Sequence, residues 1–239
     1  MTLPLTTSQV DKAGRTLRKW GRGEHLPAGA VDAAIETLFR FRAVHQYALG
    51  KATVGLRSVV STEKCDRVDV SQRLKRAPTI AAKLSREPTL SLARMQDIGG
   101  CRAVLGSIAE LRRVESRLRR NRPPVGCSDY LDTPRSSGYR GVHLIVMYGD
   151  AAGVNRRIEV QLRTLVMHEW AITVERLSGR IGHNLKRDGH HAVQTLLEAI
   201  SRAMALEETG MAVDDALLEE MDELRRIAAP FLQMGGGRG

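Results

Sequence analysis

The stretch RMQDIGGCRAVL, residues 94–105, places a carboxylate, two glycines and a guanidinium at the start of an apolar run. CRAVL is short, apolar and typical of a β-strand, so it predicts a buried strand. Such a strand needs neither Asp97 nor Arg102, because burying an unpaired charge is costly. We therefore interpret both charged side chains as functional. The plain alternative is an Asp97–Arg102 ion pair that only holds a turn together.

Two more strands are predicted downstream. GVHLIVMY, residues 141–148, is mostly apolar and indicates a buried strand, whereas RRIEVQLRT, residues 156–164, alternates like a half-buried one. Helices are expected at residues 6–20, 31–59, 78–86, 107–121, 165–177, 192–208 and 216–229. The fold class is therefore predicted as α+β (mixed α/β), a small mixed β-sheet flanked by helices.

The helix expected at residues 31–59 is the longest of these. Apolar positions recur on one face at three- and four-residue steps. The face comprises Ala34, Leu38, Phe41, Val44, Tyr47 and Ala48. One continuous helix with this face buried is the prediction.

Composition narrows the class of protein. The 239 residues carry a formal net charge of +10, which favours a polyanionic partner such as nucleic acid or a phosphorylated substrate. The bland alternative is a basic, soluble surface. Three widely spaced cysteines suit a reducing cytoplasm, and no run of 18 apolar residues predicts a membrane span. We expect a cytoplasmic protein with no membrane partner.

The strand at 156–164 adds a second carboxylate. Alternate residues of a strand share a face, so Glu159, Gln161 and Arg163 project together. By itself this row is as well explained by solvent exposure. If Asp97 lies close to Glu159, however, the two carboxylates repel each other unless a cation lies between them, and oxygen ligands suit Mg²⁺. A magnesium ion in turn suits a phosphate substrate.

A basic stretch supports a phosphate ligand. RLKRAPTIAAKLSR, residues 73–86, contains Arg73, Lys75, Arg76, Lys83 and Arg86. Arginine binds phosphate oxygens bidentately and lysine adds point charge. The alternative is a solvated helix face. Because the sequence has no GxxxxGK[ST] loop, side chains rather than a glycine cradle would hold any nucleotide phosphates.

Four segments, read in order, resemble one known family. RLKRAPTIAAKL, QDIGGCRAVL, PRSSGYRGVHLIV and EVQLRTLVMHEWA are similar to the synthetase domain of the RelA/SpoT family, the alarmone synthetases, from about Arg73 to Glu175. SQVDKAGRTLRKW and FRAVHQYALG resemble the N-terminal region of small toxic synthetases of the CapRel and PhRel type. The resemblance implies a nucleotidyltransferase-like pyrophosphokinase core at residues 61–180, after an N-terminal helical region (1–60) and before C-terminal helices (181–239).

The resemblance also implies an activity and roles. The family moves the β,γ-pyrophosphate of ATP to a 3′-hydroxyl and releases AMP. By motif, Asp97 resembles the Mg²⁺ ligand, and Glu159 resembles the catalytic carboxylate that completes the metal site and takes the hydroxyl proton. Residues matched to ATP binding are Arg73, Lys75, Lys83 and Arg102. Those matched to the acceptor are Tyr139, which would stack on its base, with Arg135, His143 and Gln161. Ser137 and Gly141 replace the usual Asn and Ser, which puts guanine recognition in doubt.

The acceptor divides the hypotheses. The favoured acceptor is the 3′-CCA end of tRNA, which would make the protein a translation-inhibiting toxin of a toxin-antitoxin or phage-defence system. The net charge supports this acceptor, and RRVESRLRRNR, residues 112–122, is a candidate RNA track or else a solvated helix. The alternative acceptor is GDP, GTP or an adenine nucleotide, giving an alarmone such as ppGpp or ppApp. A third hypothesis is a non-catalytic RNA- or partner-binding module.

The C-terminal helices leave the protein partners open. About 60 residues follow the synthetase motifs, which is short for a fused inhibitory domain. We therefore expect a separate antitoxin protein if the toxin hypothesis holds. The same helices could instead build a homo-oligomer interface.

Overall fold

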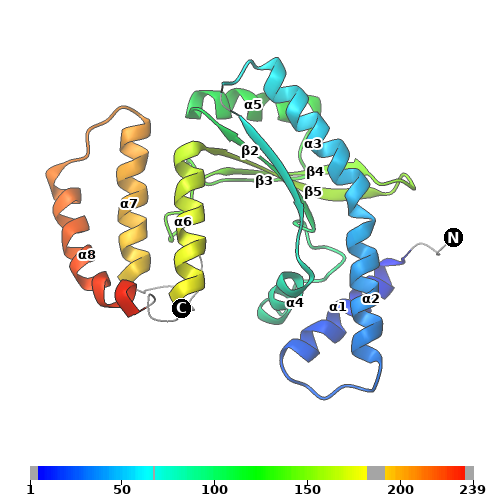
Figure 1. Ribbon diagram of the computed structural model, residues 1–239. Helices are drawn as coiled ribbons and strands as arrows, with labels where there is room; N and C mark the ends of the chain where they lie inside the picture. The colour runs from blue at the N-terminus through cyan, green and yellow to red at the C-terminus, as the bar shows by residue number, and fades with distance from the viewer. Residues whose placement is uncertain (1–4, 67, 182–191, 235–239) are drawn as a thin grey trace.

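The computed structural model describes residues 5–66, 68–181 and 192–234 (Figure 1). Its centre is a five-stranded sheet with strand order β1-β2-β5-β4-β3. The strands are β1 (Asp69–Leu74), β2 (Gly99–Leu105), β3 (Gly126–Asp129), β4 (Val142–Gly149) and β5 (Asn155–Thr164). β2 and β5 are parallel and the other neighbours antiparallel, so the sheet is mixed. The predicted α+β class is confirmed.

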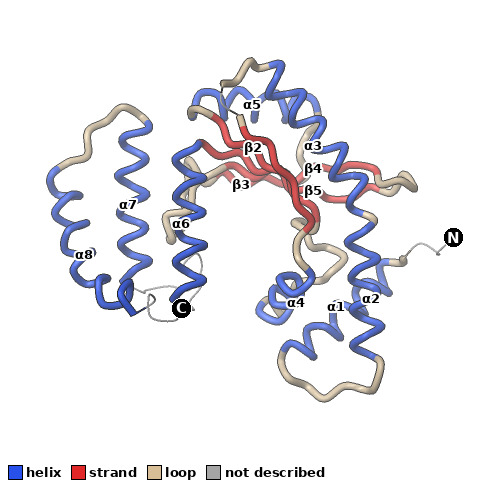
Figure 2. The backbone as a smooth tube through the Cα atoms, viewed as in Figure 1, coloured by secondary structure: helices blue, strands red, loops and turns tan. Residues whose placement is uncertain are grey.

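Helices lie on both sides of the sheet (Figure 2). In chain order they are α1 (Thr7–Gly21), α2 (Ala30–Ala43), α3 (His45–Thr62), α4 (Ala77–Arg86), α5 (Ile108–Asn121), α6 (Leu165–Ile181), α7 (Ala192–Glu208) and α8 (Asp215–Met234). α3 and α5 cover one face, whereas α4 and α6 flank the other (Figure 1). None of these helices is both long enough and apolar enough to cross a bilayer.

Two strands were not predicted. β1 is an edge strand with no fully buried position. β3 is only four residues long and forms the opposite edge. Edge strands keep polar side chains because one side of the strand lacks a neighbour. Their apolar alternation is therefore weak, and periodicity alone misses them.

The helix predicted over residues 31–59 is confirmed except for one break. It divides at Val44 into α2 and α3, and the predicted buried face fails at Val44 and Tyr47, whose exposed fractions are 36% and 53%. His45 is buried instead. The two halves pack against different cores. α2 packs with α1 and α4, and α3 packs on the sheet.

Three clusters of buried side chains position the site. The largest lies between the sheet and helices α3 and α5. A second joins α1, α2 and α4 to Leu92, Met95 and Ile98, which precede β2. The third joins α6 and α7 to Tyr139. Since α3 packs on the sheet, its residues share a core with the predicted segment 61–180; the division at residue 60 stays a prediction.

Candidate active site

Strand register assembles the site on one face of the sheet. Arg102 pairs with Ser71 on one side and Gln161 on the other, and Gln161 pairs with His143. A polar row thus crosses four strands. The next row contains Arg73, Gly100 and Glu159. The intervening residues, such as Cys101, Val160 and Leu144, face the core under α3 and α5.

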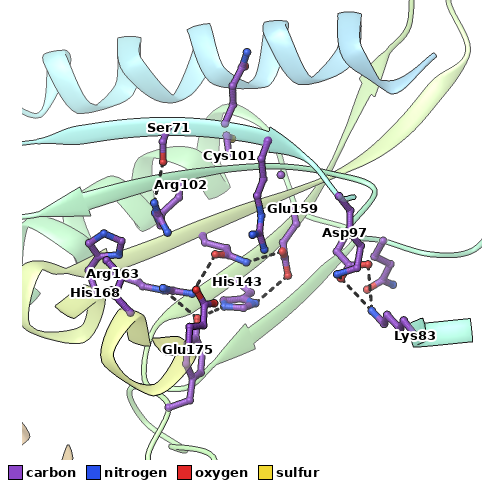
Figure 3. Close-up of a pocket in the computed structure, with 18 of the residues that line it drawn as sticks. Ser71, Lys83, Asp97, Cys101, Arg102, His143, Glu159, Arg163, His168 and Glu175 are labelled. Carbon is purple, nitrogen blue, oxygen red and sulfur yellow. Dashed lines mark hydrogen bonds and ion pairs between the residues drawn. The ribbon is translucent and has the colours of Figure 1, made fainter. Parts of the chain in front are cut away.

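This polar face lines a cavity of about 610 Å³ (Figure 3). Its cationic residues are Arg73, Lys75, Lys83, Arg102, Arg135 and Arg163, and its acidic residues are Asp97, Glu159 and Glu175. Tyr139, His143 and Gln161 line the same cavity. The structure therefore brings together all ten predicted site residues. Cations outnumber acids two to one, so the cavity suits a polyanion.

Asp97 lies just before β2, between two ammonium groups. Its Oδ2 is 2.9 Å from Nζ of Lys75 and 3.1 Å from Nζ of Lys83. Burial raises the pKa of the Asp97 carboxyl, but the two lysines more than offset it, so the pKa is lowered. The lysines reach it because β1 ends one residue before Lys75, whose amide nitrogen donates to Ile98 O, while Lys83 projects from α4.

The alternative of an Asp97–Arg102 ion pair is wrong. Arg102 Nη2 donates to Ser71 Oγ at 3.2 Å, and its buried Nε has no partner in the part of the chain that is described. Burial lowers the pKa of the Arg102 guanidinium, and the nearby charge of Arg163 adds to this. Arg102 therefore lines the cavity and carries a buried donor that no described residue satisfies.

Glu159 is held at both carboxylate oxygens. Nδ1 of His143 lies 3.0 Å from Oε1, and Gln161 Nε2 donates to Oε2 at 2.7 Å. Burial pushes the pKa of Glu159 up, and these hydrogen bonds and the interaction with His143 push it further down, so the net shift is downward. The charge of Asp97 acts to raise the pKa of Glu159, as expected for two carboxylates in one site.

The acceptor loop buries most of the Tyr139 side chain. Only 6% of Tyr139 is exposed, and its hydroxyl lies 2.6 Å from His143 Nε2. The Arg135 guanidinium lies 4.4 Å from the ring centroid of Tyr130 and 5.7 Å from that of Tyr139. Stacking of an acceptor base on Tyr139 remains a prediction.

The two departures from the family pattern fit the packing of this loop. Gly141 has φ +147°, and a Cβ there would lie 3.2 Å from Leu162 O and 3.4 Å from the Tyr139 hydroxyl. A side chain at 141 would therefore press on the loop that carries Tyr139. Ser137 is 1% exposed, and its Oγ has no partner among the residues described.

Helix α6 supplies a wall that sequence reasoning missed. His168, Ile172 and Glu175 line the cavity together with Ser71 of β1 and Arg163 of β5. The three α6 residues are spaced four and three apart, which puts them on one helix face. That spacing was readable from the sequence, but nothing local indicated that this face turns toward the cavity.

The residues present fit a shared magnesium ion. Mg²⁺ binds through one or two carboxylates together with substrate phosphates and water. Asp97 and Glu159 are such a pair on one cavity wall (Figure 3). Within the described ranges no group of three or more His, Cys, Asp or Glu side chains could hold a metal alone. Asp97 and Glu159 would thus hold Mg²⁺ only together with a phosphate ligand.

Comparison with known proteins confirms the resemblance at the level of the domain. Residues 72–176 match the family described as "Region found in RelA / SpoT proteins". GTP pyrophosphokinase YjbM of Bacillus subtilis is 29% identical over 169 residues, covering 68% of this chain and 75% of that protein. GTP pyrophosphokinase YwaC of the same organism is 22% identical over 218 residues, covering 88% of this chain and 98% of that protein.

Solved structures share the fold. The crystal structure of small alarmone synthetase 1 from Bacillus subtilis bound to its product pppGpp superimposes with a TM-score of 0.63 at 24% identity. The alignment covers 81% of this chain and 99% of that one. The predicted RelA/SpoT synthetase fold is thereby confirmed, whereas the resemblance to the toxic subtype stays a prediction.

Proposed function

We propose that this chain is an ATP-dependent pyrophosphokinase that transfers the β,γ-pyrophosphate of ATP to the 3′-hydroxyl of a guanine nucleotide, GDP or GTP. The observation that carries the proposal is one cavity on the polar face of the sheet, lined by Asp97, Glu159 and six cationic side chains. Similarity to two GTP pyrophosphokinases supports the enzyme class. We place the reaction in the cytoplasm, where ATP and guanine nucleotides are available.

The donor side of the cavity would bind the ATP phosphates. Lys75 and Lys83 already neutralise Asp97, and Arg73 and Arg102 lie on the two strands beside it. Asp97 and Glu159 would hold Mg²⁺, which would supply positive charge against the transferred pyrophosphate. Lys75 and Lys83 would hydrogen-bond phosphate oxygens. Positioning and charge neutralisation are the main demands of phosphoryl-type transfer.

Glu159 would accept the proton of the attacking hydroxyl. Because its pKa is lowered, the carboxylate is ionised at neutral pH and can act as a base. Its two hydrogen bonds fix where the oxygens lie, so the hydroxyl would be oriented as well as deprotonated. Arg135 and Tyr139 line the same cavity and would hold the acceptor.

A free nucleotide is better supported as the acceptor than tRNA. The candidate RNA track lies on α5, which covers one face of the sheet (Figure 1), and the cavity lies on the other face. Arg112 pairs with Glu115, Asp129 and Asp132. Arg119 also pairs with Glu115, and Arg117 pairs with Glu63. These ion pairs consume much of the positive charge that an RNA backbone would need.

A labelling experiment tests the activity and the acceptor together. The protein is incubated with Mg²⁺ and γ-³²P-ATP, and with GDP, GTP, an adenine nucleotide or bulk tRNA in parallel. Label on GDP or GTP is expected. Label on tRNA alone would support the toxin role, with its separate antitoxin, and contradict this proposal. No label with intact ATP would leave a binding module.

A further inference from the structure

Five polar side chains on the polar face form a closed hydrogen-bonded ring. Arg163 Nε lies 3.1 Å from the Tyr139 hydroxyl, which lies 2.6 Å from His143 Nε2. His143 Nδ1 contacts Glu159 Oε1 at 3.0 Å. In the other direction, Arg163 Nη2 donates to Gln161 Oε1 at 3.3 Å, and Gln161 Nε2 donates to Glu159 Oε2 at 2.7 Å. Two arms thus join one guanidinium to both oxygens of one carboxylate.

The chemistry of the two end groups sets the direction of the outer bonds. A guanidinium can only donate and a carboxylate can only accept. Arg163 therefore donates to the Tyr139 oxygen, and His143 Nδ1 donates to Glu159. With a neutral imidazole, Nε2 accepts the proton of the Tyr139 hydroxyl, and all bonds then run from Arg163 to Glu159.

Arg163 itself lacks the partner that its burial calls for. It is 7% exposed, and in the described ranges it donates to Tyr139 and Gln161 with no carboxylate in ion-pair contact. Its guanidinium also lies 5.0 Å from the Tyr139 ring centroid. A buried charge without an ion pair costs stability. Its burial without an ion pair therefore points to a role other than holding the fold.

We propose that Arg163 is a positioning residue that orients the Glu159 carboxylate through two hydrogen-bonded arms, and that the hydroxyl of Tyr139 is the essential link of one arm. The kinetic test of this inference rests on the proposed pyrophosphokinase activity, but its spectroscopic test does not. Tyr139 thereby has a function beyond base stacking. Removing its hydroxyl oxygen would break the hydrogen-bonded arm but would leave the ring that stacks on a base.

The first test is Tyr139→Phe, which keeps the ring and removes the hydroxyl. We expect kcat to fall about 10-fold, which corresponds to the loss of roughly one hydrogen bond in the transition state. The KM for ATP and the KM for the acceptor should each change less than about twofold. Tyr148→Phe is the matched control, because Tyr148 packs against the core on the other face. An unchanged kcat in Tyr139→Phe would overturn the role of the hydroxyl.

The second test is Arg163→Gln, with Arg163→Lys as the conservative variant. We expect kcat to fall about 100-fold or more in Arg163→Gln at nearly constant KM, because both arms are released. Adding Tyr139→Phe should cost little further, since the two changes break the same arm. Arg156→Gln is the control, since Arg156 pairs with Asp150 away from the cavity. A rise in nucleotide KM at constant kcat would mean that Arg163 binds phosphate directly, and would overturn the proposal.

The third test measures which ring nitrogen of His143 carries the proton. In the ¹⁵N-histidine-labelled chain, two-bond ¹⁵N–¹H spectra at neutral pH should show His143 protonated at Nδ1 only, with the signal assigned by its loss in His143→Asn. Tyr139→Phe should leave the proton on Nδ1, because Glu159 can only accept, and should shift the Nε2 resonance, because Nε2 loses its hydroxyl partner. An Nε2-protonated ring or an imidazolium in the unaltered chain would contradict the bond directions. Because this test needs no turnover, it stands even if no transferase activity is found.

Discussion

At the scale of single residues, the site is a balance of buried charges. Asp97 is ionised because Lys75 and Lys83 outweigh the cost of its burial. Glu159 is ionised because His143 and Gln161 donate to it. Both carboxyl groups therefore have lowered pKa values, so they are ionised at neutral pH and can bind a cation or accept a proton.

Replacement of the catalytic base is the most direct residue-scale prediction. Glu159→Gln keeps the size of the side chain and removes its charge, so we expect pyrophosphate transfer to fall at least about 1,000-fold. The circular dichroism spectrum should be unchanged. A variant that transfers at the normal rate would refute the assignment of Glu159.

The stability contributed by Asp97 should depend on pH. A carboxyl with a lowered pKa stabilises the fold above its unfolded-state pKa, and this contribution is lost as the pH falls through its folded-state pKa. Lys83→Met removes one of the two partners, so we expect a loss of about 1–3 kcal/mol at pH 7 and a smaller loss at the lowest pH at which the protein is still folded. Urea unfolding at both pH values measures this, with Lys83→Arg as the charge-keeping control. Equal losses at both pH values would contradict it.

At the scale of elements, helices outside the sheet hold the two sides of the site. On the acceptor side, Ser201 of α7 donates to Gly138 O at 2.6 Å. Glu208, at the end of α7, pairs with Arg140 at 2.8 Å and accepts from Thr164. On the donor side, Asp11 of α1 accepts from Ser91 Oγ at 2.6 Å and from the amide of Ala93 at 3.0 Å, which ties down the segment leading to Asp97.

The α7 contact should be worth more than an ordinary surface ion pair. Arg140 and Glu208 are each 9% exposed at the side chain, so Glu208→Ala leaves a buried unpaired guanidinium. We expect a loss of about 3–5 kcal/mol in urea unfolding, together with a raised KM for the acceptor. The exposed neighbour Glu207→Ala is the control. A loss below about 1 kcal/mol would show that α7 does not anchor the loop.

The packing of α1 against Leu92 can be tested by adding a single methyl group at Gly14. A Cβ at Gly14 would lie 2.7 Å from Leu92 Cβ, so Gly14→Ala should destabilise by about 1–3 kcal/mol and raise the KM for ATP. Gly50 lies in α3 with open space around the corresponding position, so Gly50→Ala should be neutral or stabilising by up to about 1 kcal/mol. Thermal unfolding of both variants measures the contrast. Equal effects would exclude a tight α1–Leu92 contact.

At the scale of the whole molecule, the sheet has a core on one face, which stabilises the fold, and the candidate active site on the other. Its face under α3 and α5 contains the largest buried cluster, and the other face lines the cavity. The basic residues behind the net charge of +10 are accordingly divided between the two faces of the sheet. Six cations line the cavity, while the arginines of α5 lie behind the sheet, several of them in ion pairs.

This separation predicts that α5 is dispensable for a nucleotide acceptor. Arg113 and Arg120 are exposed on α5. The double change Arg113→Gln and Arg120→Gln should leave kcat/KM for GTP within about twofold. If tRNA were the acceptor and α5 its track, the same change would weaken transfer and reduce its salt dependence. Initial rates at two salt concentrations distinguish the two outcomes.

The local pattern was a good guide to the central elements and a poor one to the edges. Strands β2, β4 and β5 are apolar or alternate regularly, and they were predicted. β1 and β3 are edge strands whose polar residues hide the alternation. The break at Val44 was missed because the apolar spacing continues through it, although α2 and α3 then pack on different partners.

The sequence by itself determined the class of fold, the residues of four motifs and an excess of positive charge, because periodicity and residue chemistry act over a few neighbouring positions. Only the tertiary structure decided which of these residues contact one another. It paired Asp97 with two lysines rather than with Arg102, turned α6 toward the cavity and closed the ring from Arg163 to Glu159. Those contacts depend on strand order and register between segments distant in the chain, and no local pattern encodes them.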